Sequence, residues 1–314
     1  MEQRKLIRLG NSSFAIALPK DWVDKSGLKK GDNVFLEHNS NGEVIISSEF
    51  KKEIEKKAEI DLENEDDEFV KKHLHAAYIK GYNNITFKGN VKNKKFLKDL
   101  LGDYLSFEII DSNDKGIVAK DFFDIKEAKF EDFVRRIDNN LREMFDIVIG
   151  EIKKDKIDIK SIKEIEEIDK VVNKFYFLCS RIFIKGIDNP TVLNILKMDG
   201  NKLFNNWWIS FNSESLGDGL KYVLKWMNKI NPEKNNEINN IIIGLQQSYI
   251  KSMEAFYNGD RKLALEAINE TKKIKEDIDK LEKLNSKNIK ITQALDLVEK
   301  NIYQNAKMTF YMRV

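Results

Sequence analysis

Residues 4–22 read RKLIRLGNSSFAIALPKDW, and this stretch decides how the chain begins to fold. Two short apolar runs, at 6–9 and 14–18, flank the turn-forming residues Gly-Asn-Ser at 10–12, which is typical of a β-hairpin. Pro19 follows at once and suits the first position of a helix, because its fixed φ and missing N–H are tolerated there. The stretch therefore predicts two short strands and then a short helix.

Two further short strands are expected at 33–37 and 43–47, joined by a tight turn. Four short strands and one short helix in about fifty residues bury too little apolar surface to be stable alone. We therefore expect residues 1–50 to form a small β domain that dimerises.

Residues 51–125 alternate between extended and helical patterns, which predicts a small α/β linker unit. The expected strands are near 54–62 and at 84–88, 107–111 and 116–120. Two helices are expected: the first ends near residue 79, and the second covers 92–104.

Residues 126–314 show only the helical period, with apolar residues at three- and four-residue steps as a buried helix face requires. This pattern predicts an all-α bundle of about six helices, and the whole chain is predicted to be a multidomain α+β protein. After a first helix that begins beyond residue 125, the expected helices are 161–186, 202–229, 236–257, 261–283 and 288–311.

The composition narrows the class of protein further. Of the 314 residues 41% are hydrophobic and 34% are charged, and no apolar run is long enough to cross a membrane. The one cysteine, Cys179, excludes an internal disulfide framework and fits a reducing compartment, so we expect a cytoplasmic protein without membrane insertion. The net charge is only +2, but residues 1–30 carry seven Lys or Arg against three Asp or Glu, a local basic excess suited to phosphates.

The N-terminal motifs resemble those of the AbrB/SpoVT swapped-hairpin family. A basic strand, a Gly10 turn, an apolar strand ending in Leu-Pro and the later Leu28-Lys-Lys-Gly-Asp32 occur in the family's order. The resemblance implies an intertwined homodimer that lays its basic strand–turn surface on DNA, with Lys5, Arg8 and Lys20 as candidate contacts. The alternatives are that these are solvated edge-strand charges, or that the domain only dimerises.

The rest of the chain resembles archaeal PhoU-related phosphate uptake regulators that carry such an N-terminal domain. The resemblance rests on HAAYIKGYNNITF at 75–87, FEDFVRRIDNNLREMFD at 130–146, EEIDKVVNKFYFL at 166–178 and the segment SMEAFYNGDRKLALEAINETKKIKEDIDKLEKL at 252–284. It implies a bundle built from two three-helix repeats. It also implies a role in phosphate homeostasis, with a phosphate-transporter component or a sensor protein as partner.

An internal repeat is visible in the predicted bundle. Glu-Glu-Ile-Asp-Lys at 166–170 recurs as Glu-Asp-Ile-Asp-Lys at 276–280, each within an amphipathic segment. Short charged matches also arise by chance in a chain so rich in Glu, Asp and Lys, so the repeat depends on the family resemblance for support.

Two pairs of acids are candidate metal ligands. Glu166 with Asp169, and Glu214 with Asp218, are spaced so that both carboxylates share one helix face. The resemblance implies that the Glu-x-x-x-Asp motif binds a divalent metal ion or iron, and hard cations prefer such oxygen ligands. The alternative is a solvated acidic face.

The second half departs from this pattern. The residue four positions after Glu299 is Tyr303, and a neutral phenol is a poor ligand for a hard cation. Whether Glu276, Asp279 and Glu299 bind anything is left open by the sequence, and occupancy is expected mainly in the first half.

Other chemistry-bearing residues give no catalytic pattern. His73 and His75 are about 200° apart around a helix and cannot share a metal, and Cys179 lies among apolar residues typical of a core. Without a phosphate-binding loop or a nucleophile–base pattern we expect no enzyme.

The sequence therefore predicts a regulator of phosphate uptake that binds DNA through its first domain and receives a signal through its bundle. The alternative is an interaction regulator without DNA binding, in which the β domain only joins two bundles and the bundles act on a transporter or a sensor.

Overall fold

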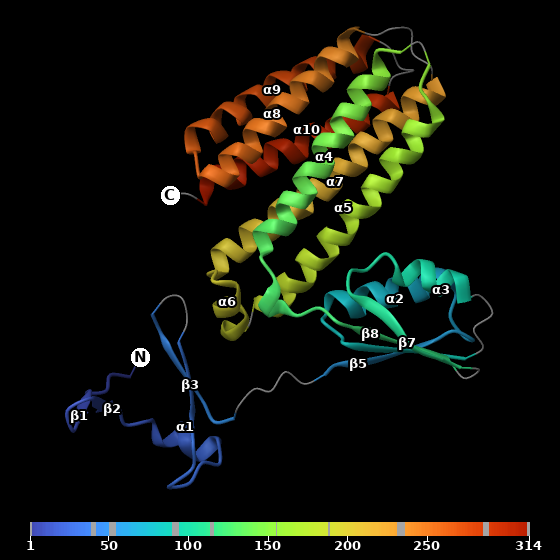
Figure 1. The fold of residues 1–314 in the computed structure, drawn as a ribbon. Coiled ribbons are helices and arrows are strands. Elements are labelled where there is room, and N and C mark those ends of the chain that lie inside the picture. The colour runs from blue at the N-terminus through green and yellow to red at the C-terminus, as the bar shows by residue number, and fades with distance from the viewer. Residues whose placement is uncertain are drawn as a thin grey trace. The chain divides into compact units, whose positions relative to one another are not determined.

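A computed structural model of the chain shows two compact units, residues 1–54 and residues 55–314 (Figure 1). The second unit contains both the α/β segment and the helical bundle. The structure describes residues 2–38, 42–49, 55–89, 94–113, 116–154, 156–187, 189–230, 236–284 and 289–312.

The N-terminal unit is made of two separate two-stranded antiparallel sheets and one short helix. Its elements are β1 (Ile7–Leu9), β2 (Ser13–Ala15), α1 (Lys20–Lys25), β3 (Phe35–His38) and β4 (Val44–Ser47). Gly10 lies in the β1–β2 turn with φ of +68°, in the left-handed region that favours glycine. None of the described residues of this unit is buried, so these residues form no core by themselves.

The second unit begins with a four-stranded sheet and two helices. Its elements are β5 (Lys57–Asp61), α2 (Asp67–Ile79), β6 (Asn84–Lys88), α3 (Lys94–Leu101), β7 (Phe107–Asn113) and β8 (Gly116–Asp121). The strand order is β5-β6-β8-β7, parallel between β5 and β6 and antiparallel elsewhere. Leu74, Tyr78, Phe87 and Leu97 are buried in the core that the helices and sheet share.

The helical bundle follows a short 3-10 turn, Ile125–Glu127. Its described helices are α4 (Phe130–Ile152), α5 (Ile159–Gly186), α6 (Pro190–Leu196), α7 (Gly200–Ile230), α8 (Asn236–Asn258), α9 (Arg261–Leu284) and α10 (Ile289–Tyr311). Six are long, as predicted. The short α6 was not predicted; it begins at Pro190, in the gap between the expected helices 161–186 and 202–229.

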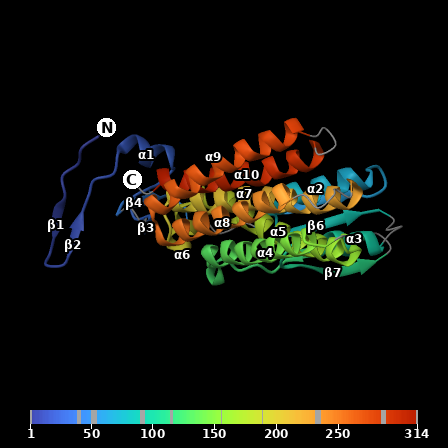
Figure 2. The ribbon, with the colours of Figure 1, turned by 90° about the horizontal axis from the view of Figure 1, so that it is seen from above.

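The six long helices form two sets of three. Helices α4, α5 and α7 pack on one another, and so do α8, α9 and α10 (Figure 1, Figure 2). The sets are joined where α7 packs along α10 and α4 packs against α8. The repeated motif lies on α5 and on α9, the second helix of each set. The multidomain α+β fold and its six-helix bundle are thus confirmed.

Arg181 of α5 joins the bundle to the α/β layer. Its guanidinium forms an ion pair with Asp121 at the end of β8, and the two side chains are 0% and 1% exposed. It also donates hydrogen bonds to the carbonyl oxygens of Tyr78, at 2.5 Å, and of Tyr82, at 3.3 Å. Ser106 Oγ donates to Asp121 at 2.6 Å, so polar groups surround this buried pair.

Among the described helices, none has the length and hydropathy that a membrane crossing requires.

Candidate functional site

The three candidate DNA contacts are all exposed on the N-terminal unit. Lys5 precedes β1, Arg8 is the middle residue of β1, and Lys20 is the first residue of α1. Arg8 Nε donates a hydrogen bond to the carbonyl oxygen of Gly10 at 3.1 Å, which holds its guanidinium beside the turn. The role of Lys5, Arg8 and Lys20 as phosphate contacts stays a prediction, and the exposure of all three side chains is compatible with it.

Large apolar side chains of the same unit are open to solvent. Leu6, Leu9 and Phe14 are 66%, 58% and 63% exposed, and Leu36 of β3 is 60% exposed. So much exposed apolar surface on about fifty residues marks an interaction surface.

The first acidic cluster lies between α5 and α7. Lys221 Nζ donates hydrogen bonds to Asp169 Oδ2 at 2.7 Å and to Asp218 Oδ1 at 2.5 Å. Glu166 pairs instead with Lys225, whose Nζ lies 2.6 Å from Glu166 Oε1. The structure thus brings Asp169 and Asp218 together and places an ammonium group between them.

Burial changes the protonation of this cluster. Burial raises the pKa of Glu214 to about 7, and the neighbouring Asp218 and Asp169 add to the effect. Burial also raises the pKa of Asp169, against the hydrogen bond from Lys221, whereas the hydrogen bond from Lys225 lowers the pKa of Glu166. A carboxyl group that holds its proton near neutral pH is a weaker metal ligand than an ionised one.

With Lys221 in this position, the four acids do not fit a divalent ion. The ammonium group occupies the space between Asp169 and Asp218 that a cation needs, and it neutralises their charge. Across the described residues, no group of three or more His, Cys, Asp or Glu is arranged to hold a metal. Metal binding by Glu166, Asp169, Glu214 and Asp218 stays a prediction, and it requires Lys221 to move away.

A second lysine-centred cluster lies between α9 and α10. Lys275 Nζ is 2.7 Å from Asp279 Oδ1 and 2.8 Å from Asp296 Oδ1. Burial raises the pKa of the nearby Glu299 to about 7, with Lys275 opposing and Asp296 and Asp279 adding to the shift. Asp279 is the counterpart of Asp169 in the repeated motif, so each half of the bundle carries a lysine held by two aspartates.

Metal was expected mainly in the first half of the bundle, because Tyr303 stands where the motif has an acid. In the structure Tyr303 packs with Ala267, Ile268 and Phe310 in a small apolar cluster. The second aspartate of the Lys275 cluster is Asp296 instead. Lys221, Lys275 and Asp296 were missed, although the spacings Asp218–Lys221 and Lys275–Asp279 are those of helical ion pairs.

Cys179 and His75 are both in apolar surroundings. Cys179 is buried, and burial raises the pKa of its thiol to about 12, which agrees with the predicted core role. His75 has its ring 4.4 Å from that of Phe177, and burial lowers its pKa.

Residues 7–59 match the family model described as antidote-toxin recognition MazE, bacterial antitoxin. No curated protein and no solved structure matches the chain. The match supports the swapped-hairpin assignment of the N-terminal unit and stops before the helical bundle. The chain is therefore similar to MazE antitoxins over its N-terminal β unit.

Proposed function

We propose that the protein is a homodimeric, DNA-binding regulator whose N-terminal unit contacts DNA and whose helical bundle receives a signal. The observation that carries the proposal is the MazE-type match of residues 7–59, on a unit whose strand–turn segment presents Arg8 beside Gly10. In the dimer each basic side chain occurs twice, so phosphate contacts and counterion release add up on one duplex.

The uncovered apolar side chains support the homodimer. A second copy of the same unit offers the same exposed leucines and phenylalanine, and pairing two copies removes both sets from water. A basic surface that remains outside such an interface is then free for DNA.

A role in phosphate homeostasis is the finer part of the proposal. It is supported by the resemblance to archaeal PhoU-related regulators and by a bundle made of two packed three-helix sets. A phosphate-transporter component or a sensor protein in the cytoplasm is the proposed partner of the bundle.

The second candidate is a regulator that acts by binding another protein, without DNA. The description of the matching family favours this second candidate. It names an antidote that recognises a toxin, which suggests that a β unit of this type can bind another protein. The N-terminal unit then serves for assembly and partner binding only.

Fluorescence anisotropy with labelled DNA from the region upstream of the protein's own reading frame, at two salt concentrations, separates the candidates. A DNA-binding regulator binds this duplex, and its affinity falls steeply between the two concentrations. Absence of binding at the lower salt concentration, with the protein shown to be a folded dimer, contradicts the first candidate and favours the second.

A further inference from the structure

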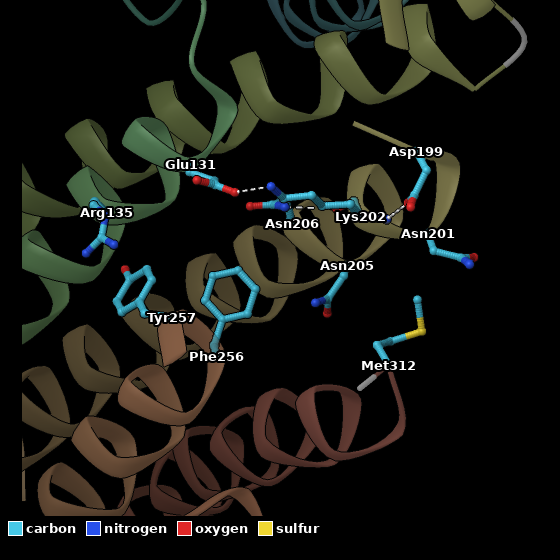
Figure 3. Close-up of a pocket in the computed structure, with 10 residues that line it drawn as sticks. All are labelled: Glu131, Arg135, Asp199, Asn201, Lys202, Asn205, Asn206, Phe256, Tyr257 and Met312. Atoms are coloured by element: carbon cyan, nitrogen blue, oxygen red, sulfur yellow. Dashed lines mark hydrogen bonds and ion pairs between the residues drawn. The ribbon is translucent and has the colours of Figure 1, made fainter. Parts of the chain in front are cut away.

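A hollow of about 290 Å³ opens at one end of the bundle, where the two three-helix sets meet. The first set contributes residues from the beginnings of α4 and α7, and the second contributes residues from the ends of α8 and α10 (Figure 3). No part of the proposed DNA-binding role uses it.

Two asparagines of this pocket have buried acceptors without partners. Asn205 and Asn206 are 7% and 2% exposed, and the Oδ1 atom of each has no hydrogen-bond partner among the described residues. Asn206 Nδ2 donates to the carbonyl oxygen of Lys202 at 2.9 Å, which fixes that side chain. Buried polar atoms without partners are rare, because each one loses its hydrogen bonds to water on folding.

Further unpartnered polar groups continue from the pocket into the bundle. Thr309 and Asn305 share one face of α10, and the pocket residue Met312 follows the end of this helix, three residues after Thr309. Ser252 shares a face of α8 with the pocket residue Phe256 in the same way. Thr309, Asn305 and Ser252 are at most 1% exposed, and their side-chain polar atoms have no partner among the described residues.

The pocket also contains a positively charged group, the exposed guanidinium of Arg135 on α4. The guanidinium of Arg135 lies over the ring of Tyr257, 4.0 Å from its centroid, and makes no ion pair within the described residues. Tyr257 is itself held, because its hydroxyl donates to Asp138 at 3.1 Å. The other pocket cation, Lys202, is paired with Glu131 at 2.7 Å.

The positions of these groups define a ligand with two different ends. Figure 3 shows the rings of Tyr257 and Phe256 between Arg135 on one side and Asn205 on the other. Arg135 suits a carboxylate or a phosphate, since a guanidinium binds either through paired N–H groups. The Oδ1 atoms of Asn205 and Asn206 are closed to solvent and lack partners among the described residues, so a hydroxylated ligand supplies the donors that they need once the two side chains turn toward the pocket.

We propose that this pocket binds a small anionic hydroxylated metabolite, with its carboxylate or phosphate on Arg135 and its hydroxyl groups on the asparagines. Arg135 and the asparagines belong to the first three-helix set, and the rings of Phe256 and Tyr257 between them belong to the second, so a bound ligand contacts both sets. The proposal does not depend on DNA binding, because the pocket lies wholly within the bundle.

Titration calorimetry and thermal unfolding of the full chain test it. The two-ended probes are glycerol 3-phosphate and glycerate, which differ in the anionic group; inorganic phosphate, acetate and glycerol each present one end alone. We expect at least one two-ended probe to raise the unfolding midpoint, and to bind at least tenfold more tightly than either of its halves. If neither two-ended probe binds, or if a half binds equally well, the proposal is overturned.

Two pairs of variants assign the binding to the pocket. Arg135→Gln should weaken the bound probe at least tenfold, whereas Arg136→Gln, the neighbouring arginine over the ring of Phe175, should not. Asn205→Leu should abolish binding of the probe. It should also raise the unfolding midpoint of the ligand-free protein, because it removes a buried polar atom that has no partner among the described residues. Asn139→Leu, at an exposed position of α4, is its control. Equal effects of the two arginine variants, or full binding by Asn205→Leu, would place the ligand elsewhere and overturn the assignment.

Discussion

Arg181 and Asp121 form a fully buried ion pair although sixty residues separate them in the chain. The pair ties helix α5 of the bundle to the last strand of the α/β sheet. Since Arg181 also holds the carbonyl oxygens of Tyr78 and Tyr82, one side chain fixes how the two layers meet.

Removing the charge of Asp121 should therefore destabilise the folded protein. Asp121→Asn leaves the guanidinium of Arg181 buried without its counter-charge, and we expect the free energy of unfolding to fall by about 3–5 kcal/mol. Glu167→Gln, which breaks the exposed pair with Lys170, should cost about 1 kcal/mol or less. Urea unfolding followed by circular dichroism measures both, and similar losses would show that the buried pair contributes no more than an exposed one.

The raised pKa of Glu214 predicts a stability that depends on pH. A carboxyl group whose pKa is higher in the folded than in the unfolded protein favours folding while it is protonated. Its contribution is lost as the pH rises from about 4.5 to about 7. At pH 8 we expect Glu214→Gln to be more stable than the wild type by about 1–2 kcal/mol, reduced from a full conversion because Glu214 is partly exposed. At pH 4.5 the two should be alike, and exposed Glu164→Gln should change little at either pH. A constant difference across this range would contradict the assignment.

The arrangement of Lys221 between Asp169 and Asp218 leads to a prediction about metal binding. Lys221→Met removes the ammonium group from between Asp169 and Asp218, and should give stronger stabilisation by Mg²⁺ or Mn²⁺ than the wild type shows. Adding Glu214→Ala and Asp218→Ala to this variant should remove the effect. Lys225→Met, which frees only Glu166, is the matched control in the thermal unfolding experiment. If the wild type is stabilised more than Lys221→Met, the lysine does not compete with the metal.

Lys5, Arg8 and Lys20 make a prediction about DNA. Replacing all three by Ala should weaken DNA binding and lower the slope of log affinity against log salt by about one unit for each lost phosphate contact, doubled in a dimer. Lys163, Lys272 and Lys273 are exposed lysines of the bundle, and their triple Ala variant removes the same charge as a control. Anisotropy titrations at several salt concentrations give the slopes. Equal slopes for the wild type and the first variant would remove these residues from the interface.

The N-terminal unit makes a prediction about assembly. A chain of residues 55–314 keeps both the α/β core and the bundle core, so it should fold with a strong helical spectrum. It loses the exposed apolar residues of the first unit and should therefore sediment largely as a monomer. A truncated chain that stays a tight dimer in sedimentation would place the dimer interface in the second unit.

Periodicity and turn residues predict most of the elements. The helix expected at 202–229 is α7 at Gly200–Ile230, and the one expected at 261–283 is α9 at Arg261–Leu284. These boundaries are predictable because an apolar helix face and the residues that end a helix are local in the sequence. The strand expected at 14–18 is shorter, since β2 ends at Ala15.

The buried polar contacts could not be predicted in this way. Nothing near Arg181 in the sequence points to Asp121, and a buried arginine has the same local pattern as an exposed one. The pocket depends on Arg135 and Asn205 from one repeat meeting Tyr257 from the other, a contact that only tertiary packing creates. The carboxylates of the expected metal site were recognised by spacing, but Lys221, which closes the site, was not.

Because none of the described residues of the N-terminal unit is buried, the concentration of the chain should decide how much of this unit is folded. If residues 1–54 gain a core only by pairing, their folding and their association are one equilibrium, which shifts with chain concentration as well as with temperature. At low concentration the paired fraction rises in proportion to the chain concentration and the number of pairs rises with its square. Dilution then lowers the concentration of the dimer by a larger factor than the concentration of the chain, even while the 55–314 unit stays folded.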